Sequence, residues 1–363
     1  MSTTSAVRPS TTGRKDYGYS NARVRGMRAR LLNRSFYDTL IEARDIQQMI
    51  QELTSTGYGP DLEEVLIKGR DAAVVDEALK NNLVRTYRKI LGFLNDEGRG
   101  LATTLLGRWD VFNIKTILRG KHMRLPAEEV GESLVPAGQL SEIELNAMLA
   151  QDDVKSAIDA AVTLGLPYAA ALRYGIGEYA KTGELAGLEL SLDRHYAEWA
   201  TKRLSRRGAN AAIARRILGT QIDIVNLLTV FRMQKADIES LDVAQFHLPG
   251  GLAIGADLFE EVAGMSDVDQ VLDRLRNTMY GPALEDAAMK YIEVNSLSVF
   301  ERALEDHLIR KVTLSGVHDP LGVGVVVSYL TAKQNEITNL RIIVKGKSIG
   351  MPVERVREEL ILV

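Results

Sequence analysis

The stretch Asp110-Val-Phe-Asn-Ile-Lys-Thr-Ile-Leu-Arg119 occurs in related form three times in the chain. The other two copies are Asp223-Ile-Val-Asn-Leu-Leu-Thr-Val-Phe-Arg232 and Glu336-Ile-Thr-Asn-Leu-Arg-Ile-Ile-Val-Lys345. All three share an acid, an apolar residue, any residue, Asn, an apolar residue, two of any kind, two apolar residues and a base. The asparagines are 113 residues apart both times. This spacing predicts three tandem, homologous units.

The spacing within each copy is helical. Counting from the acid, the asparagine is the third residue on, and apolar residues are the fourth and the seventh. At about 100° per residue these positions share one face of an α-helix. The base at the ninth position points away from that face, near the expected helix C-terminus, where a cation is favoured by about 0.3–1 kcal/mol. Because Leu, Ala, Glu and Arg are also abundant elsewhere, we expect an all-α fold of three helical units.

The period also organises the chain outside the pattern. Pro136 and Gly138, for example, recur one period later as Pro249 and Gly251. A repeat fixes the period and not the phase, so the unit boundaries are a convention. We place a disordered Ser-, Thr- and Pro-containing tail, three helical repeat units and a C-terminal helix at residues 1–15, 16–124, 125–237, 238–350 and 351–363.

The acid, the asparagine and the base of each copy are the candidate functional residues. Buried polar groups need hydrogen-bond partners, and two interpretations follow. One is an internal clamp to an adjacent loop or helix end, which is the usual role of buried polar groups. The other is that the three faces converge on a pseudo-threefold axis and hold a partner. The nine residues are Asp110, Asn113, Arg119, Asp223, Asn226, Arg232, Glu336, Asn339 and Lys345.

Composition excludes several classes of protein. The 363 residues are 45% hydrophobic and 26% charged, which is ordinary for a globular protein. The absence of cysteine excludes disulfides, thiolate metal sites and a cysteine nucleophile. A net charge of -3 gives no reason to expect nucleic acid as a partner. There is no apolar run of about 18 residues, so no segment is expected to span a bilayer.

Resemblances to catalytic motifs are incomplete. Lys345-Gly346-Lys347-Ser348 ends like a P-loop, but Arg341 stands where that loop needs its first glycine. None of the five histidines pairs with another at helical spacing. Glu305-Asp306-His307 is better interpreted as a solvated helix face than as a ligand set. We therefore expect no catalytic residues, no metal and no cofactor.

Two groups of arginines are candidate docking residues. Arg23, Arg25 and Arg28 belong to a basic N-terminal helix, and Arg206 and Arg207 to a second basic patch. One interpretation is that they are solvated faces. The other is docking to an acidic partner or to anionic lipid headgroups near a membrane.

These features together resemble a known family. The segment Tyr19-Ser-Asn-Ala-Arg-Val-Arg-Gly-Met27 is similar to its N-terminal signature. The segments Gly107 to Lys121 and Asn335 to Lys347 look like its inner-helix motifs. The family is that of the C subunits of the archaeal-type and vacuolar-type rotary ATPases, whose eukaryotic members are called d subunits. The resemblance covers Asp16 to Val363, and only the residues before Asp16 depart from it.

The resemblance implies a non-catalytic rotor protein shaped as a pseudo-threefold funnel. One end would sit on the membrane proteolipid ring, and the other would receive the central shaft, which consists of the D and F subunits. The protein would transmit torque between ATP chemistry and proton or sodium transport. It would lie peripherally at the cytoplasmic face of the cell membrane, with membrane contact through the ring. The alternatives are a helical-repeat scaffold outside a rotary motor, whose usual period is about 20–50 residues, and a helical enzyme with an unrecognised site.

Overall fold

The computed structural model describes residues 16–236 and 243–362, and over these ranges the chain forms helices and no β-strand. The all-α prediction is confirmed. The predicted disordered tail at residues 1–15 lies outside the described residues. No helix within these ranges is both long enough and apolar enough to cross a bilayer.

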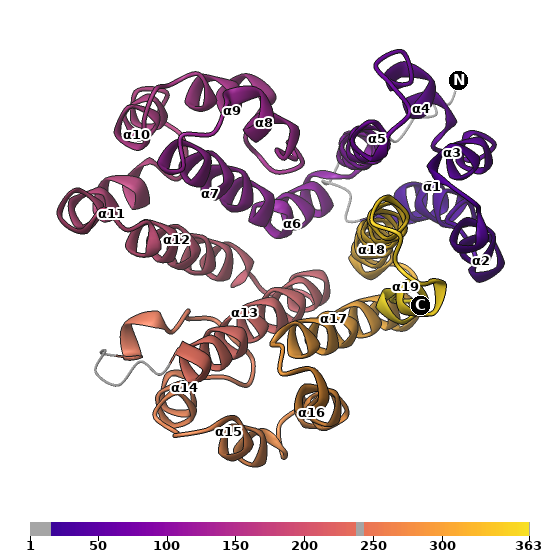
Figure 1. Cartoon of the computed structure of the whole chain (residues 1–363). Helices are drawn as coiled ribbons and strands as arrows, with labels where there is room; N and C mark the ends of the chain where they lie inside the picture. The colour runs from indigo at the N-terminus through magenta and orange to yellow at the C-terminus, as the bar shows by residue number, and fades with distance from the viewer. Residues whose placement is uncertain (1–15, 237–242, 363) are drawn as a thin grey trace, which may run out of the picture.

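The helices gather into three lobes around three hydrophobic cores (Figure 1). The middle of the chain forms the α7–α12 lobe, whose core runs from Val111 to Leu192. Its helices, with α6 leading into them, are α6 (Asp96–Leu106), α7 (Arg108–His122), α8 (Ala127–Glu132), α9 (Glu142–Leu149), α10 (Val154–Thr163), α11 (Ala169–Thr182) and α12 (Ala186–Leu204).

The next stretch forms the α13–α17 lobe, whose core runs from Ile224 to Leu304. A long inner helix again begins the lobe, and shorter helices return around it. The elements are α13 (Ala209–Ala236), the 3-10 helix η1 (Val243–Phe246), α14 (Ala256–Ala263), α15 (Val268–Leu275), α16 (Gly281–Val294) and α17 (Ser298–His318).

The two ends of the chain form the third lobe together, which we call the terminal lobe. In Figure 1 the yellow C-terminal helices lie among the indigo N-terminal ones. Its core continues into α6, α12 and the first half of α13, so the terminal lobe merges with the centre of the molecule. The helices are α1 (Gly18–Arg28), α2 (Arg34–Glu42), α3 (Ile46–Thr54), α4 (Gly59–Val65), α5 (Ala72–Phe93), α18 (Val323–Ser348) and α19 (Val353–Glu359).

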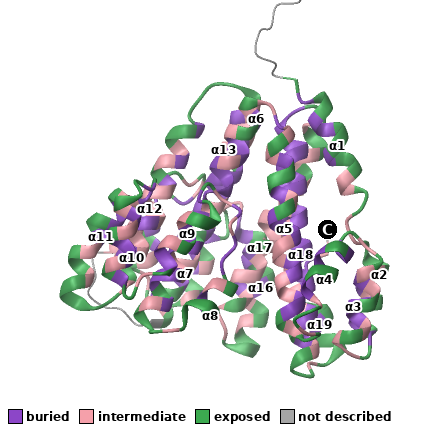
Figure 2. Cartoon of the chain, turned by 90° about the horizontal axis from the view of Figure 1, so that it is seen from above, coloured by how far each residue is buried: buried purple, intermediate pink, exposed green. Residues whose placement is uncertain are grey.

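The three copies of the pattern lie on α7, α13 and α18, one in each lobe, and we call these the inner helices. The hydrophobic cores therefore divide the chain at different residues from the conventional unit boundaries. Helix α13 contacts α12, α17 and α18, which brings the three lobes into contact around the inner helices. Figure 2 shows much of α5, α13 and α18 buried, and the molecule narrowing toward the end that carries α1 and α6.

Local sequence explains where individual helices begin. Asp45, Asp71 and Asn95 accept a hydrogen bond from a backbone N–H in the first turn of the following helix, which satisfies an otherwise unpaired donor. Pro60 and Pro282 stand in the first turns of α4 and α16, where their missing N–H costs nothing. These five helices thus begin at ordinary capping signals.

Candidate functional site

The asparagine of each copy holds a segment that follows the next short helix along the chain. The side chain of Asn113 donates to the Val135 carbonyl over 2.8 Å and accepts from the Val135 N–H over 2.7 Å. The same two-point pairing joins Asn226 to Leu248 and Asn339 to Ile361, always 22 residues on. An amide matches a backbone unit in both donor and acceptor, so each asparagine replaces one missing backbone partner.

The acid of the first copy collects donors from a loop and a tyrosine. Asp110 is fully buried in α7 and accepts from the N–H groups of Gln139 and Leu140, each over 2.9 Å. The Tyr168 hydroxyl lies 3.3 Å from the same carboxylate. A Cβ on Gly138 would come within 2.0 Å of Asp110 Oδ1, so glycine is needed there for the loop to approach.

The second copy repeats this arrangement with more donors. Asp223 is fully buried and accepts from the N–H groups of Leu252, Ala253 and Ile254 over 2.8–3.0 Å. The Tyr280 hydroxyl donates to it over 2.8 Å. A Cβ on Gly251, one period after Gly138, would lie 2.1 Å from Asp223 Oδ1.

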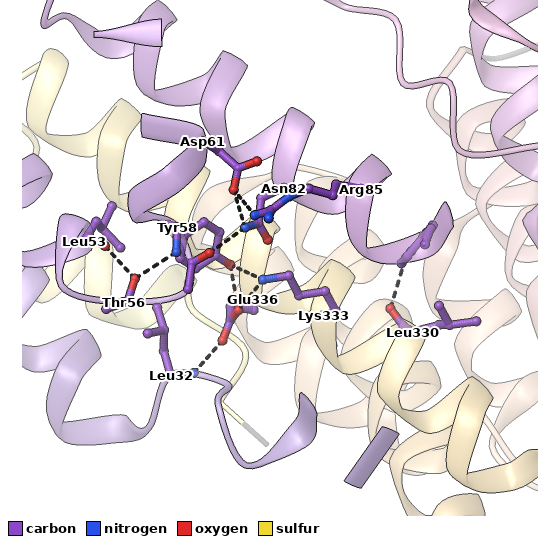
Figure 3. A network of polar contacts seen from close by, with 12 residues as sticks. Leu32, Leu53, Thr56, Tyr58, Asp61, Asn82, Arg85, Leu330, Lys333 and Glu336 are labelled. Carbon is purple, nitrogen blue, oxygen red and sulfur yellow. Dashed lines mark hydrogen bonds and ion pairs between the residues drawn. The ribbon is translucent and has the colours of Figure 1, made fainter. Parts of the chain in front are cut away.

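The third copy uses the same position to join the two chain ends (Figure 3). Glu336 accepts from the Leu32 N–H and from the Tyr58 hydroxyl, both over 2.6 Å. Lys333, one helical turn earlier, donates to Glu336 over 2.9 Å and to the Tyr58 hydroxyl over 2.8 Å. Tyr58 precedes Glu336 by 278 residues, so these contacts close the third lobe.

A second polar cluster lies beside this one in the terminal lobe (Figure 3). Asp61 accepts from the Asn82 amide over 2.7 Å and forms an ion pair with Arg85. Asn82 also donates to the Gly57 carbonyl over 3.0 Å. The cation Arg85 thus has a carboxylate from its own lobe.

Burial governs the electrostatics of these groups. It raises the pKa of Asp110, although the N–H groups of Leu140 and Gln139 oppose the shift. Burial lowers the pKa of Lys333, and Glu336 opposes that shift. Burial also raises the pKa of the Tyr58 hydroxyl well above its ordinary value, and the Glu336 charge adds to the effect.

The acids and asparagines of the three copies, which we call the clamp residues, all form contacts inside the molecule. The acids and asparagines of all three copies are almost completely buried, and each bonds to its own lobe. Across residues 16–236 and 243–362, no group of three His, Asp or Glu side chains is placed to hold a metal. Among the described residues, these contacts hold loops against helices.

The bases of the pattern lie on the outside, as the helical spacing predicted. Arg119 forms a bidentate ion pair with Glu189, with both contacts at 2.6 Å. Arg232 pairs with Glu301 over 2.7 Å. Lys345 is exposed.

The five candidate docking arginines divide into two groups. In α1, Arg23 contacts the Tyr19 hydroxyl and the Phe93 ring, Arg25 donates to the Pro320 carbonyl, and Arg28 donates to Ser328 Oγ over 2.8 Å. These three side chains help to fasten α1. Arg206 and Arg207, in the turn between α12 and α13, are exposed and form no ion pair with any described residue.

The sequence analysis did not identify the tyrosines that bond to the clamp acids, although two of them lie in matching sequence segments. Thr56-Gly-Tyr-Gly-Pro60 matches Thr278-Met-Tyr-Gly-Pro282. In both corners the threonine hydroxyl donates to the carbonyl three residues before it, over 2.6 Å. Lys333 was missed because only the fold reveals that it is buried.

A cavity of about 250 Å³ lies between α7, α12, α13 and α17. Arg108 and Gln221 line it, and they occupy the same position of the period as Gln334, which accepts a hydrogen bond from Arg108. The buried Gln221 Oε1 has no hydrogen-bond partner among the described residues. This central region therefore carries polar groups from all three inner helices.

Comparison with known proteins places the chain. A family model described as ATP synthase (C/AC39) subunit matches residues 20–359. The C subunit of the A-type ATP synthase of Methanocaldococcus jannaschii is 28% identical over 346 residues, covering 95% of this chain and 86% of the relative. The C subunit of the V-type ATP synthase of Deinococcus radiodurans is 30% identical over 352 residues, covering 95% and 91%. The chain belongs to the ATP synthase (C/AC39) subunit family.

Proposed function

We propose that this chain is a non-catalytic central-stalk component of an A-type or V-type ATP synthase, which carries torque between the central shaft and the membrane proteolipid ring. The observation that carries the proposal is the similarity to named ATP synthase C subunits over 95% of the chain. The physiological partners would be the D and F subunits of the shaft and the ring, with the chain at the cytoplasmic face of the cell membrane. No nucleic acid and no cofactor take part.

The clamps support a mechanical role. Torque transfer needs a body that does not deform, and buried, fully satisfied polar networks make packing specific and rigid. In each lobe a long inner helix is tied to its loops by the asparagine and acid contacts. In the terminal lobe the same contacts fasten the two chain ends to each other. A load applied to one lobe would reach the others through α13, which contacts α12, α17 and α18.

The shaft would engage at the cavity between α7, α12, α13 and α17, which we call the central cavity. Arg108, Gln221 and Gln334 bring one polar side chain from each inner helix to this region. Phe112 and Val225, which share one position of the period, are 44% and 40% exposed. A few polar groups among exposed apolar ones give a partner both affinity and orientation.

Affinity purification from the native membrane tests the proposal. The tagged full chain serves as bait in mild detergent, and co-purifying proteins are identified by mass spectrometry. Recovery of shaft subunits together with the ring proteolipid is the expected result. Recovery of other proteins with no ATP synthase component would overturn the proposal and favour the helical-repeat scaffold.

Charge reversal in the α12–α13 turn tests which surface is used. The double change Arg206→Glu and Arg207→Glu should weaken assembly, because both arginines are exposed and free to meet an acidic surface. Arg173→Glu with Lys181→Glu, at exposed positions on α11, is the matched control. Equal recovery of the complex with both double variants would remove this turn from the interface.

A further inference from the structure

A cavity of about 350 Å³ opens between α13 and α17, outside the clamps and the central cavity. This volume falls at the lower end of small-molecule sites, which span about 300–1,000 Å³. Its walls are largely apolar and include Ile213, Ile217, Val312 and Leu314. Its polar lining includes the cations Arg216 and Lys311, together with His318 and Asp319.

The two cations of this cavity lack a carboxylate partner. Neither Arg216 nor Lys311 forms an ion pair with any described residue. The half-buried Lys311 ammonium has one close contact, Met279 Sδ at 3.6 Å, and a thioether is a weak acceptor. Asp319 instead accepts from the Gly324 N–H over 3.0 Å at the start of α18. Burial lowers the pKa of the Lys311 ammonium. The negative charge of Asp223 opposes this shift, and the positive charge of Arg216 adds to it.

The terminal lobe contains a cation at the repeat position of Lys311, and there the cation is paired with a carboxylate. Arg85 on α5 and Lys311 on α17 are 226 residues apart, which is twice the repeat period. Each lies beside its Tyr-Gly-Pro corner: Lys311 touches Met279, and Arg85 pairs with Asp61. The corner Tyr58-Gly-Pro-Asp61 matches Tyr280-Gly-Pro-Ala283. The corner position that carries Asp61, the partner of Arg85, is therefore alanine beside Lys311's corner.

The two matched cavities also differ in how they are filled. In the terminal lobe the cavity beside Arg85 is about 140 Å³, and Met27 and Leu31, at the end of α1 and just after it, help to line it. In the α13–α17 lobe the lining residues belong only to α13, to α17 and to the turn at Asp319, and the space is about 350 Å³. The α13–α17 cavity thus lacks a counterpart of the carboxylate that pairs with Arg85 and of the apolar side chains that α1 and the residues after it supply in the terminal lobe.

We propose that the α13–α17 cavity binds an amphipathic carboxylate, with the carboxylate on Lys311 and Arg216 and the apolar group against Ile213, Ile217 and Leu314. The ligand replaces what Asp61, Met27 and Leu31 provide in the terminal lobe. A free medium-chain carboxylic acid and an acidic side chain with apolar neighbours on an adjoining protein of the complex share this chemistry. Binding by the isolated chain does not depend on the proposed function, whereas a neighbouring protein as the source of the carboxylate rests on it.

Calorimetric titration of the purified full chain tests the proposal with octanoate as the probe and 1-octanol as its uncharged counterpart. We expect octanoate to bind more tightly than octanol by roughly tenfold or more, because hydrogen bonds to a charged group are stronger than those to a neutral one. Lys311→Met should abolish this preference, whereas Lys290→Met, at an exposed position on α16, should retain it. Equal affinity for the two probes, or an unchanged preference in Lys311→Met, overturns the proposal.

A gain-of-carboxylate variant makes the test independent of losing Lys311. Ala283→Asp places a carboxylate where Asp61 stands in the terminal lobe, so it should neutralise Lys311 and abolish octanoate binding. Both variants should keep the helical circular dichroism of the parent. Lys311→Met removes a partly buried cation that forms no ion pair with any described residue, and Ala283 is only partly buried. Undiminished octanoate binding by a folded Ala283→Asp variant would contradict the proposed position of the anion.

The complex isolated from the native membrane distinguishes the two sources of the carboxylate. Release of about one amphipathic acid per chain on solvent extraction identifies a free ligand. No release, together with protection of Lys311 from acetylation, identifies an acidic side chain of a neighbouring protein. Both results support the site. Acetylation of Lys311 as readily in the complex as in the isolated chain, with nothing released, counts against it.

Discussion

Asp223 in the α13–α17 lobe and Glu336 in the terminal lobe occupy the same position of the repeat, but they are neutralised in different ways. Asp223 accepts three backbone N–H groups from one nearby loop. Glu336 accepts one backbone N–H, from Leu32 at the other end of the chain, and pairs with the buried Lys333. A lobe closed by a continuous loop is satisfied locally. A lobe closed by two chain ends needs a longer acid and a buried cation.

The difference predicts that the terminal clamp is the more fragile. Glu336→Gln keeps the shape of the side chain but leaves Lys333 buried without its counter-charge, which should cost about 3–5 kcal/mol of unfolding free energy. Asp223→Asn leaves no buried cation unpaired and should cost less, about 1–3 kcal/mol. Urea unfolding followed by circular dichroism measures both.

The double variant Lys333→Met with Glu336→Gln is the control for this ranking. Removing both charges should recover part of the loss, because a buried pair can often be replaced by apolar groups at little cost. If Asp223→Asn destabilises the protein as much as Glu336→Gln, the proposed distinction between the two clamps is wrong.

The clamp tyrosines give a finer ranking. Tyr58 contacts both Glu336 and Lys333, Tyr280 contacts Asp223 over 2.8 Å, and Tyr168 lies 3.3 Å from Asp110. Substitution by Phe leaves buried partners unsatisfied, at about 1–3 kcal/mol. We expect the loss to be largest for Tyr58→Phe and smallest for Tyr168→Phe in the same unfolding experiment. An inverted order would show that these distances do not report the strength of the bonds.

Some of this arrangement could be predicted from the sequence, because it repeats. The period of 113 residues indicated three similar helices. Placing Asp110, Asn113 and their counterparts on an apolar face indicated that they would need partners. Gly138 and Gly251 recur together because each lets a loop approach a buried carboxylate. Each of these features depends on residues close together in the sequence or on positions that recur with the repeat.

The closure of the terminal lobe could not be predicted in the same way. Leu32 and Tyr58 bond Glu336 across 304 and 278 residues, and no local pattern indicates which N-terminal groups reach α18. Lys333 looks like an ordinary surface lysine in the sequence, and Thr220 stands one period before it. The repeat predicts shared positions, whereas the differences between copies arise from tertiary contacts.

The buried acid of the α7–α12 lobe should make stability depend on pH. Burial raises the pKa of Asp110 above its ordinary value of 3.8. Between that value and the folded-state pKa, Asp110 is therefore protonated to a greater extent in the folded state than in the unfolded state. The unfolding free energy of the parent, relative to Asp110→Asn, should therefore fall as pH rises from 3.8 toward the folded-state pKa. Urea unfolding of both proteins between about pH 3.5 and 7 measures this difference.

An exposed helix cap is the control with the opposite sign. The Ser156 backbone N–H lowers the pKa of Asp153 below its ordinary value. The parent should therefore gain stability relative to Asp153→Asn as pH rises to the ordinary pKa, and lose it as pH falls through the folded-state pKa. Parallel slopes for Asp110→Asn and Asp153→Asn would mean that burial does not control the titration of Asp110.

The bases of the pattern should matter least, because their ion pairs are exposed. Pairs of this kind contribute about 0.2–1 kcal/mol. Arg119 and Glu189 form two contacts, and the Glu189 side chain is only 19% exposed. Arg232 and Glu301 form one contact, with Glu301 44% exposed. In urea unfolding at low salt, Arg119→Met should therefore cost more than Arg232→Met, and the gap should shrink in 1 M salt, where the screening length is about 3 Å. A salt-independent gap would assign the loss to packing of the arginine stem rather than to its charge.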